Sequence, residues 1–173
     1  MSKTKLKKLT FLAILTAASL VMFLIEALIP LPIPLPGVKL GLGNIVTTGL
    51  LFLFGWREAL CVLLLRVFLG SVLTGQLGAL VYSLCGGLLS LLVLICLRRA
   101  LAPHPLWIAG VLGGAIHNVG QLLAAIVLTR TPSVTVYLPL LLCCGMLAGL
   151  FTGLCAQFLL QRLKKTKFLE DIL

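Results

Sequence analysis

The stretch LWIAGVLGGAIHNVGQLLAAIVL, residues 106–128, holds no charged residue in 23 positions. A helix of that length rises about 34 Å, and the hydrocarbon core of a bilayer is about 30 Å thick. The stretch is therefore predicted to cross a membrane. Near its middle it carries His117, Asn118 and Gln121, whose polar groups lipid cannot satisfy. What these three side chains bind is the main question that the sequence raises.

The rest of the chain has the same character. Its 173 residues are 61% hydrophobic and 10% charged, with a mean hydropathy of +1.22. Such a composition predicts an all-α integral membrane protein, a bundle of six transmembrane helices in a single domain over residues 1–173. The apolar runs lie at 9–29, 42–56, 58–75, 77–97, 106–128 and 136–161, between basic tails at 1–8 and 162–173.

The first two runs raise separate questions. The run 9–29 is long enough to span, and no small-x-small cleavage site precedes Pro30, so we interpret it as a retained helix and not a signal peptide. The run 42–56 would rise only about 22 Å as a helix. We expect it to be buried among other helices, to extend into the preceding loop, or to form a re-entrant hairpin with the next run.

Basic residues are distributed unequally around the apolar runs. With six spans and a cytoplasmic N-terminus, eleven of them lie inside, two outside and Arg66 within a span. The inside set is Lys3, Lys5, Lys7, Lys8, Arg57, Arg98, Arg99, Arg162, Lys164, Lys165 and Lys167, and the outside set is Lys39 and Arg130. The positive-inside rule then predicts that both termini are cytoplasmic. This pattern accounts for the formal charge of +10 without a nucleic-acid partner.

The first outer loop, PLPIPLPGVKLGLG, runs from Pro30 to Gly43. Its four alternating prolines favour an extended, polyproline-like backbone. Its leucines and isoleucine are too apolar for a freely solvated loop. It is predicted either to cover the outer mouth of the bundle as a lid or to lie as a plain connector in the headgroup region.

Small residues at spacings of four predict close helix packing. Gly110 and Gly114 share one such face in the fifth run, and Gly145, Gly149 and Gly153 share another in the sixth. Ala13 and Ala17 form a further face near the cytoplasmic end of the first run. That face could be internal or could dock a partner protein.

Polar residues inside the spans are the candidate site. Arg66 lies near the middle of the third run, where it needs a partner or a wet cavity. It could pair with Glu26 and only hold helices together, or it could bind a carboxylate or phosphate of a substrate. His117 and Gln121 are four residues apart, which predicts a shared binding face with Asn118. Asn44 and Gln76 could complete the mouth of the cavity.

Several function classes lack their sequence signatures. The chain has no GxxxxGK[ST] motif for ATP, no intramembrane row of acids and no nucleophile elbow. Its six cysteines form no C-x-x-C pair and show no metal-ligand spacing with the two histidines. We therefore expect a binder or conduit and not an enzyme, with no cofactor and no metal site.

Four segments carry a family resemblance: VKLGLGNIVT at 38–47, LLLRVFLGSVLTG at 63–75, SLCGGLLSLLV at 83–93 and GGAIHNVGQLLAA at 113–125. They resemble the bacterial heptaprenyl diphosphate synthase component I family, also called the Gx transporter family, over about residues 10–160. That family is similar to the S components of energy-coupling factor transporters. Those are six-helix subunits that bind a vitamin-like solute and use a shared coupling protein and two ATPases.

The resemblance implies a substrate-binding subunit of such an importer in the bacterial cytoplasmic membrane. The A-x-x-x-A face on the first helix, Ala13 and Ala17 here, would dock the coupling protein. The alternative is a non-catalytic accessory subunit of polyprenyl diphosphate or quinone biosynthesis, and a third possibility is a scaffold. The chain has a single aspartate, Asp171, and prenyl-chain elongation needs aspartate-rich motifs to hold Mg²⁺. A catalytic prenyl synthase would then have to be a separate partner.

Overall fold

A computed structural model describes residues 3–28, 41–102 and 104–164. Every regular element in these ranges is helical, with no strand among them. The elements are α1 (Lys3–Leu28), α2 (Asn44–Leu53), α3 (Trp56–Thr74), α4 (Leu77–Leu101), α5 (Leu106–Thr129), the 3-10 helix η1 (Pro132–Tyr137) and α6 (Leu138–Leu163). The predicted all-α architecture is confirmed for the described residues, with six α-helices, whereas six transmembrane spans and cytoplasmic termini stay predictions.

Four of the helical segments are long and apolar enough to cross a membrane. They are Lys3–Glu26, Leu80–Leu101, Leu106–Thr129 and Pro132–Leu163. The 19-residue α3 also has the length for a crossing, but three charged residues, Arg57, Glu58 and Arg66, set it apart from these four. The structure therefore indicates a multi-pass membrane protein.

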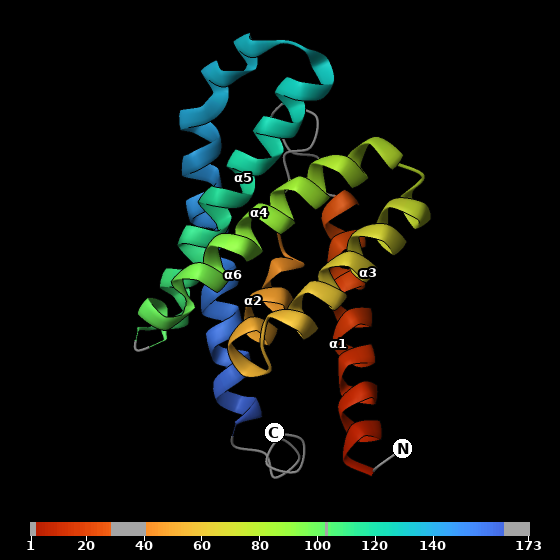
Figure 1. Ribbon diagram of the computed structural model, residues 1–173. Coiled ribbons are helices and arrows are strands. Elements are labelled where there is room, and N and C mark those ends of the chain that lie inside the picture. The colour runs from red at the N-terminus through yellow and green to blue at the C-terminus, as the bar shows by residue number, and fades with distance from the viewer. Residues whose placement is uncertain (1–2, 29–40, 103, 165–173) are drawn as a thin grey trace.

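The short second run forms α2, which is only 10 residues long. Such a helix rises about 15 Å and cannot cross a bilayer. Seven of its residues, Ile45 to Leu51, are buried. At its end Gly55 has φ 133°, and α3 then leaves in a different direction (Figure 1). Burial among the other helices, one of the three alternatives for this run, is observed, and α2 by itself is too short to cross the membrane.

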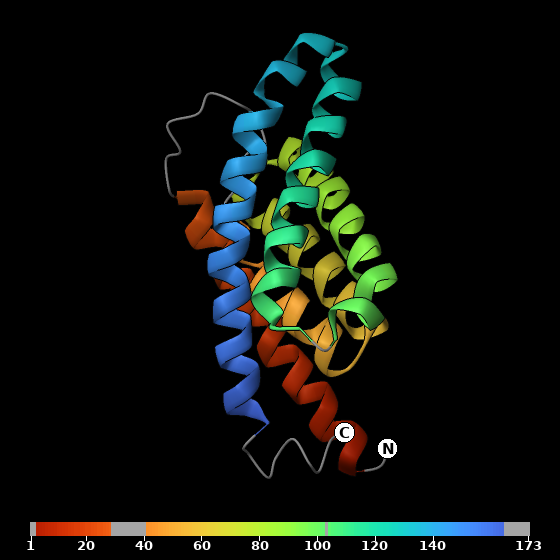
Figure 2. The same ribbon diagram turned by 90° about the vertical axis from the view of Figure 1, so that its left-hand side faces the viewer.

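The long helices surround α2. In Figure 1, α3 and α4 cross the front of the bundle at a tilt, while α1 and α6 run along its length. The view from the side shows α5 beside α6 (Figure 2). The first turn of α1 and the last turn of α6 lie at the same end of the molecule (Figures 1 and 2).

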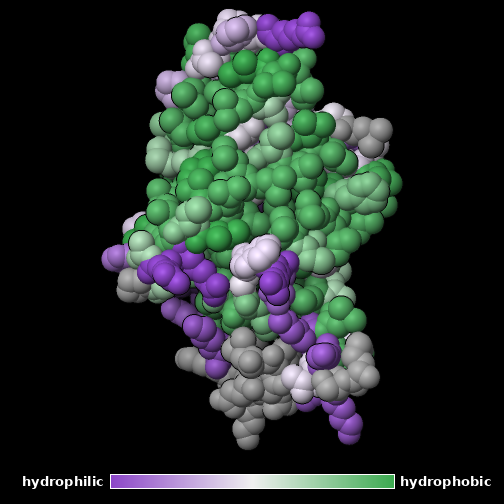
Figure 3. Space-filling view, in the orientation of Figure 1, coloured by the Kyte–Doolittle hydropathy of each residue, from purple (hydrophilic) through white to green (hydrophobic). Residues whose placement is uncertain are grey.

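The surface has the polarity expected of a protein in a bilayer. In the view of Figure 3 a broad hydrophobic belt separates hydrophilic residues at the two ends, and more of these gather where α1 begins and α6 ends. Large apolar side chains on α1, including Leu9, Ile14 and Val21, are more than half exposed. Exposure of this kind is stable in lipid and costly in water.

Glycines set the spacing of α4, α5 and α6. A Cβ at Gly114 would lie 2.1 Å from the carbonyl oxygen of Gly145, and one at Gly110 would lie 2.3 Å from that of Gly149. On the other side of α5, a Cβ at Gly120 would meet the backbone of Gly86 at 2.8 Å. The predicted small-residue faces of α5 and α6 are confirmed, because these backbones touch where any side chain would separate them.

Candidate binding site inside the helical bundle

The three polar residues of α5 are all buried but do not share one face. Asn118 points to α6, where its Nδ2 donates a hydrogen bond of 2.6 Å to the carbonyl oxygen of Leu141. His117 and Gln121 face α4, since a Cβ at Gly86 would lie 2.9 Å from an atom of each. Adjacent residues on a helix are about 100° apart, so His117 and Asn118 reach different neighbours.

Gln121 is only 4% exposed, yet neither atom of its amide has a hydrogen-bond partner among the described residues. Leaving a buried polar group unsatisfied costs about 1–3 kcal/mol. A water or a bound molecule that satisfies this amide would remove the penalty. Gln121 is therefore buried with no partner for its amide among the described residues, and it does not line the polar cavity.

A small polar cavity lies between α2, α4, α5 and α6. Its side chains come from all four helices, and glycines of α5, α6 and the turn before α2 form the rest of its wall. The polar lining residues are Asn44, Thr48, Ser90, His117, Asn118 and Thr152, and the glycines are Gly41, Gly110, Gly113, Gly114, Gly145 and Gly149. The cavity measures about 10 Å³, which is room for about one water molecule.

Two hydroxyls of this cavity already donate to backbone. Ser90 donates to the carbonyl oxygen of Gly113 at 2.9 Å, and Thr152 donates to that of Gly149 at 3.1 Å. Each hydroxyl oxygen keeps lone pairs that can accept a hydrogen bond from the cavity. The cavity wall therefore offers the hydroxyl oxygens of Ser90 and Thr152 as acceptors, in addition to the donors and acceptors of Asn44 and His117.

Arg66 finds a partner inside the protein. It is 3% exposed, and its Nη2 donates to Oδ1 of Asn44 at 3.1 Å. A Cβ at Gly43 would lie 1.8 Å from Nη1 of Arg66, so only glycine at position 43 leaves room for the guanidinium. Arg66 does not line the cavity itself but fixes Asn44, which does.

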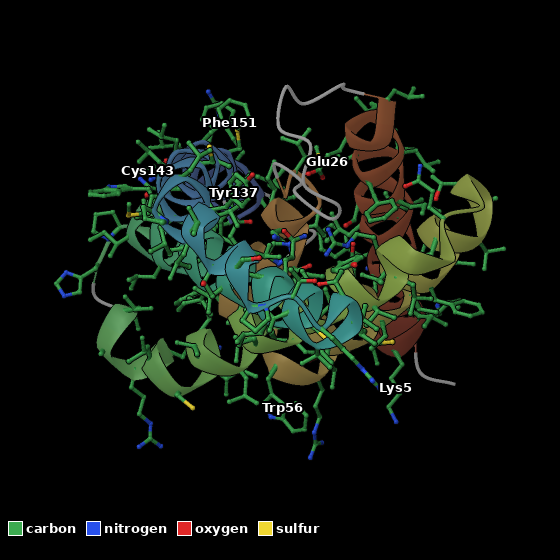
Figure 4. All side chains as sticks on the ribbon, turned by 90° about the horizontal axis from the view of Figure 1, so that it is seen from above. Lys5, Glu26, Trp56, Tyr137, Cys143 and Phe151 are labelled. Carbon is green, nitrogen blue, oxygen red and sulfur yellow. The ribbon has the colours of Figure 1, made fainter. Side chains whose placement is uncertain are left out.

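Glu26 holds the same turn from the opposite helix. Its carboxylate accepts hydrogen bonds from the backbone N–H of Gly41 and, at 3.2 Å, of Leu42. Figure 4 shows Glu26 on the side of α1 that faces the bundle. Its charge acts favourably on that of Arg66. Gly41 has φ 77°, a left-handed conformation that suits glycine. Glu26 and Arg66 thus clamp the turn Gly41–Asn44 from two helices.

The remaining predicted residues lie elsewhere. Gln76 is exposed at the N-cap of α4 and does not line the cavity. Ala13 and Ala17 are exposed on α1. Most of the predicted lid falls at residues 29–40, outside the described residues, which include only its last part, Gly41 to Gly43.

Three cavity residues were missing from the sequence-based site: Thr48, Ser90 and Thr152. Hydroxyls are common in membrane helices, where they bond to their own backbone, so their presence alone did not single them out. A usable signal was that Thr152 lies beside Gly149 and Gly153, on the face that packs against α5. No group of three metal-ligating side chains occurs within the described ranges.

Comparison with known proteins adds one result to this geometry. No curated protein and no solved structure matches the chain. Residues 15–159 match the family described as heptaprenyl diphosphate synthase component I, which covers most of the sequence, including α2 to α5 in full. This chain of apolar helices with a buried polar centre belongs to the heptaprenyl diphosphate synthase component I family.

Proposed function

We propose that the protein is a non-catalytic, substrate-binding membrane subunit of an importer similar to energy-coupling factor transporters. Its solute is small and anionic or vitamin-like, and partner ATPases supply the energy. The observation that carries the proposal is the convergence of polar side chains from α2, α4, α5 and α6 on one cavity. An ionisable residue inside a membrane bundle, here His117 among these polar groups, supports a functional site by default.

The arrangement described here is a closed one. A cavity of about 10 Å³ is far below the roughly 300–1,000 Å³ of small-molecule sites. Solute entry therefore requires the lining helices to move apart. The glycine contacts fix α5 against α6 and α4, whereas α2 is short and is fastened at its start by Glu26 and Arg66. We infer that α2 and the turn before it open the site.

The charge of the solute follows from the two residues that fasten this turn. Arg66 is the buried cation of the described ranges. An anionic group of the solute would compete with Glu26 and Asn44 for the guanidinium of Arg66. If the solute displaced them, the turn Gly41–Asn44 would be released. A neutral solute has no means to do so. This exchange supports an anion that displaces Glu26 and first contacts Arg66 and Asn44, with His117, Asn118 and Gln121 deeper in the bundle.

The exposed face of α1 suits a partner. Ala13 and Ala17 are exposed and small, so another helix can approach the backbone closely there. We assign this face to the transmembrane coupling protein, with both termini in the cytoplasm of a bacterium.

The family description favours a second candidate, a non-catalytic accessory subunit of polyprenyl diphosphate synthesis. The designation "component I" implies a partner synthase. Such a partner would have to supply the aspartate-rich motifs, since Asp171 is the one aspartate of the sequence.

Affinity purification of the tagged protein from its own membranes distinguishes the two candidates. The importer predicts that ATPases and a coupling protein are recovered, and that Ala17→Leu abolishes their recovery. Ala18→Leu, one position further round the same exposed helix, is the matched control and should leave recovery unchanged. Recovery of a prenyl synthase in place of ATPases would support the accessory subunit and contradict the importer.

A further inference from the structure

A second pocket, with no lining residue in common with the polar cavity, lies at the end of the bundle where α4 ends, α5 begins and α6 ends. It measures about 600 Å³ and is partly open to the surface. Its walls come from α2, α4, α5, α6 and the α4–α5 connection. The lining residues are Phe52, Arg98, Ala102, His104, Pro105, Leu106, Gln157, Leu160, Gln161 and Lys164. We call this the basic pocket.

The two cations of the basic pocket have no side-chain partner among the described residues. Within the described part of the chain, neither Arg98 nor Lys164 makes an ion pair or a side-chain hydrogen bond. The two acidic residues of that part are occupied elsewhere: Glu58 pairs with Lys8 at 2.6 Å, and Glu26 binds the turn before α2. Two positive charges therefore border the pocket, and none of its described lining residues is acidic.

Backbone donors add to this positive field. Helix α5 begins at Leu106 on the pocket wall, and its N-cap, Pro105, provides no side-chain cap. The N–H of Ile108 in the first turn donates to the carbonyl oxygen of Pro105 at 3.1 Å, and the remaining N–H groups of this turn carry the positive end of the helix dipole. The last carbonyls of α4 lie at the same rim, but those of Arg98 and Leu101 already accept hydrogen bonds from Ala102 and His104. The arrangement of donors favours an anion with several oxygens.

The other wall is apolar and contains one unsatisfied acceptor. Phe52, Leu106 and Leu160 present hydrocarbon to the space. Oε1 of Gln157 is buried and has no hydrogen-bond partner among the described residues. A free inorganic anion would leave this apolar wall uncovered, whereas an amphiphile would cover it with its chain. Basic pockets between membrane helices are also where phosphate head groups bind.

We propose that the basic pocket binds an amphiphile with a phosphate head group, held by Arg98, Lys164 and the start of α5. The chain of the amphiphile lies along Phe52, Leu106 and Leu160. The ligand is either an anionic phospholipid of the surrounding leaflet or a phosphorylated apolar metabolite. The proposal is independent of the importer function and of the cavity around Asn44.

The test compares charge variants of the full-length protein in dodecyl maltoside. Dodecyl phosphate is titrated, and bound molecules are counted by native mass spectrometry. Arg98→Gln/Lys164→Gln should lower the affinity at least tenfold. The matched control, Arg99→Gln/Arg162→Gln, removes two charges from the same helix ends at exposed residues outside the pocket, and it should change the affinity less than twofold. Wild-type affinity in the first variant, or an equal loss in the control, would overturn the proposal.

Single variants, inorganic phosphate and lipid nanodiscs provide additional tests of the basic pocket. If the double variant does not fold, the single variants Arg98→Gln and Lys164→Gln are compared, and each should lose part of the affinity. Inorganic phosphate that binds as tightly as dodecyl phosphate would overturn the role of the apolar wall. Selective retention of phosphatidylglycerol from nanodiscs of mixed phosphatidylcholine and phosphatidylglycerol would identify a bilayer lipid as the source. Binding of dodecyl phosphate without that selectivity would identify a phosphorylated metabolite.

Discussion

Arg66 in the middle of α3 donates a hydrogen bond from Nη2 to Oδ1 of Asn44, the first residue of α2, at 3.1 Å. The carboxylate of Glu26 on α1 accepts hydrogen bonds from the backbone N–H groups of Gly41 and Leu42, in the turn that leads to Asn44. A buried arginine thereby fastens the start of a short helix whose apolar residues Ile45, Val46, Leu50 and Leu51 pack in the core. The position of α2 in turn determines the size of the polar cavity.

Gly43 leaves the space in which the Arg66 guanidinium lies, so Gly43→Ala should displace it. The added Cβ would lie 1.8 Å from Nη1, and forcing extra volume into a packed site costs about 1–3 kcal/mol. Gly49→Ala is the control, because Gly49 is buried on α2, which begins directly after Gly43, and no atom lies within 4 Å of an added Cβ. Thermal unfolding in detergent should show a lower Tm for Gly43→Ala and an unchanged or higher Tm for Gly49→Ala. If the two variants had the same Tm, the position of the Arg66 guanidinium beside Gly43 would not contribute to stability.

The clamp on the turn predicts coupling between Glu26 and Arg66. Removing one member of a buried charged pair is destabilising by about 3–5 kcal/mol, because the other is left uncompensated. Glu26→Gln and Arg66→Met should each lower the Tm strongly, and the double variant should lose less than the sum of the two. The double-mutant cycle should give a coupling of about 1–3 kcal/mol. Additive losses would show that the two residues act independently.

The glycine contact between α5 and α6 predicts a large effect from a single methyl group. Gly114→Ala would place its Cβ 2.1 Å from a backbone oxygen, which only separation of the helices can relieve. We expect a lower Tm, or loss of the folded protein on size-exclusion chromatography. Gly78→Ala, on exposed α4 backbone with nothing within 4 Å, should leave both measurements unchanged. Equal behaviour of the two variants would contradict the close packing of α5 on α6.

Much of this fold could be predicted from the sequence because the physics is local. The length of each apolar run, the basic ends and the spacing of Gly110, Gly114, Gly145 and Gly149 each specify a helix or a contact without reference to the rest of the chain. The short run around Asn44 to Leu53 could be narrowed to three alternatives only. Which of the three arrangements the run adopts depends on the helices that pack around it, and a hydropathy pattern does not identify those helices.

The site could be predicted in composition but not in arrangement. His117, Asn118 and Gln121 are buried at the centre as expected, yet they face two different helices. The partner of Arg66 proved to be an asparagine beside a glycine, because the guanidinium fills the space that Gly43 leaves. Gln76 has the same polarity as Gln121 but caps an exposed helix end. The depth and direction of a side chain depend on helix tilt and on contacts between helices, and neither can be read from the amino-acid sequence alone.

Gln121 distinguishes a binding site from a packing device. Both atoms of its amide are buried without a partner in the described part of the protein, so Gln121→Met should remove a penalty of about 1–3 kcal/mol from the empty protein. We expect an unchanged or higher Tm together with weaker retention of the solute on purification. A lower Tm would show that the amide serves the fold and not a ligand.

The central claim, that the polar cavity holds a solute, is tested most directly by the small molecules released when the purified protein is denatured. Mass spectrometry of the released fraction is compared between the wild type and Thr48→Val, which removes one cavity hydroxyl at nearly constant volume. We predict one defined solute, released in about equal amount to the protein by the wild type and at least tenfold less by the variant. The same yield from both proteins, or no small molecule from the wild type under growth conditions that require uptake, would contradict the account.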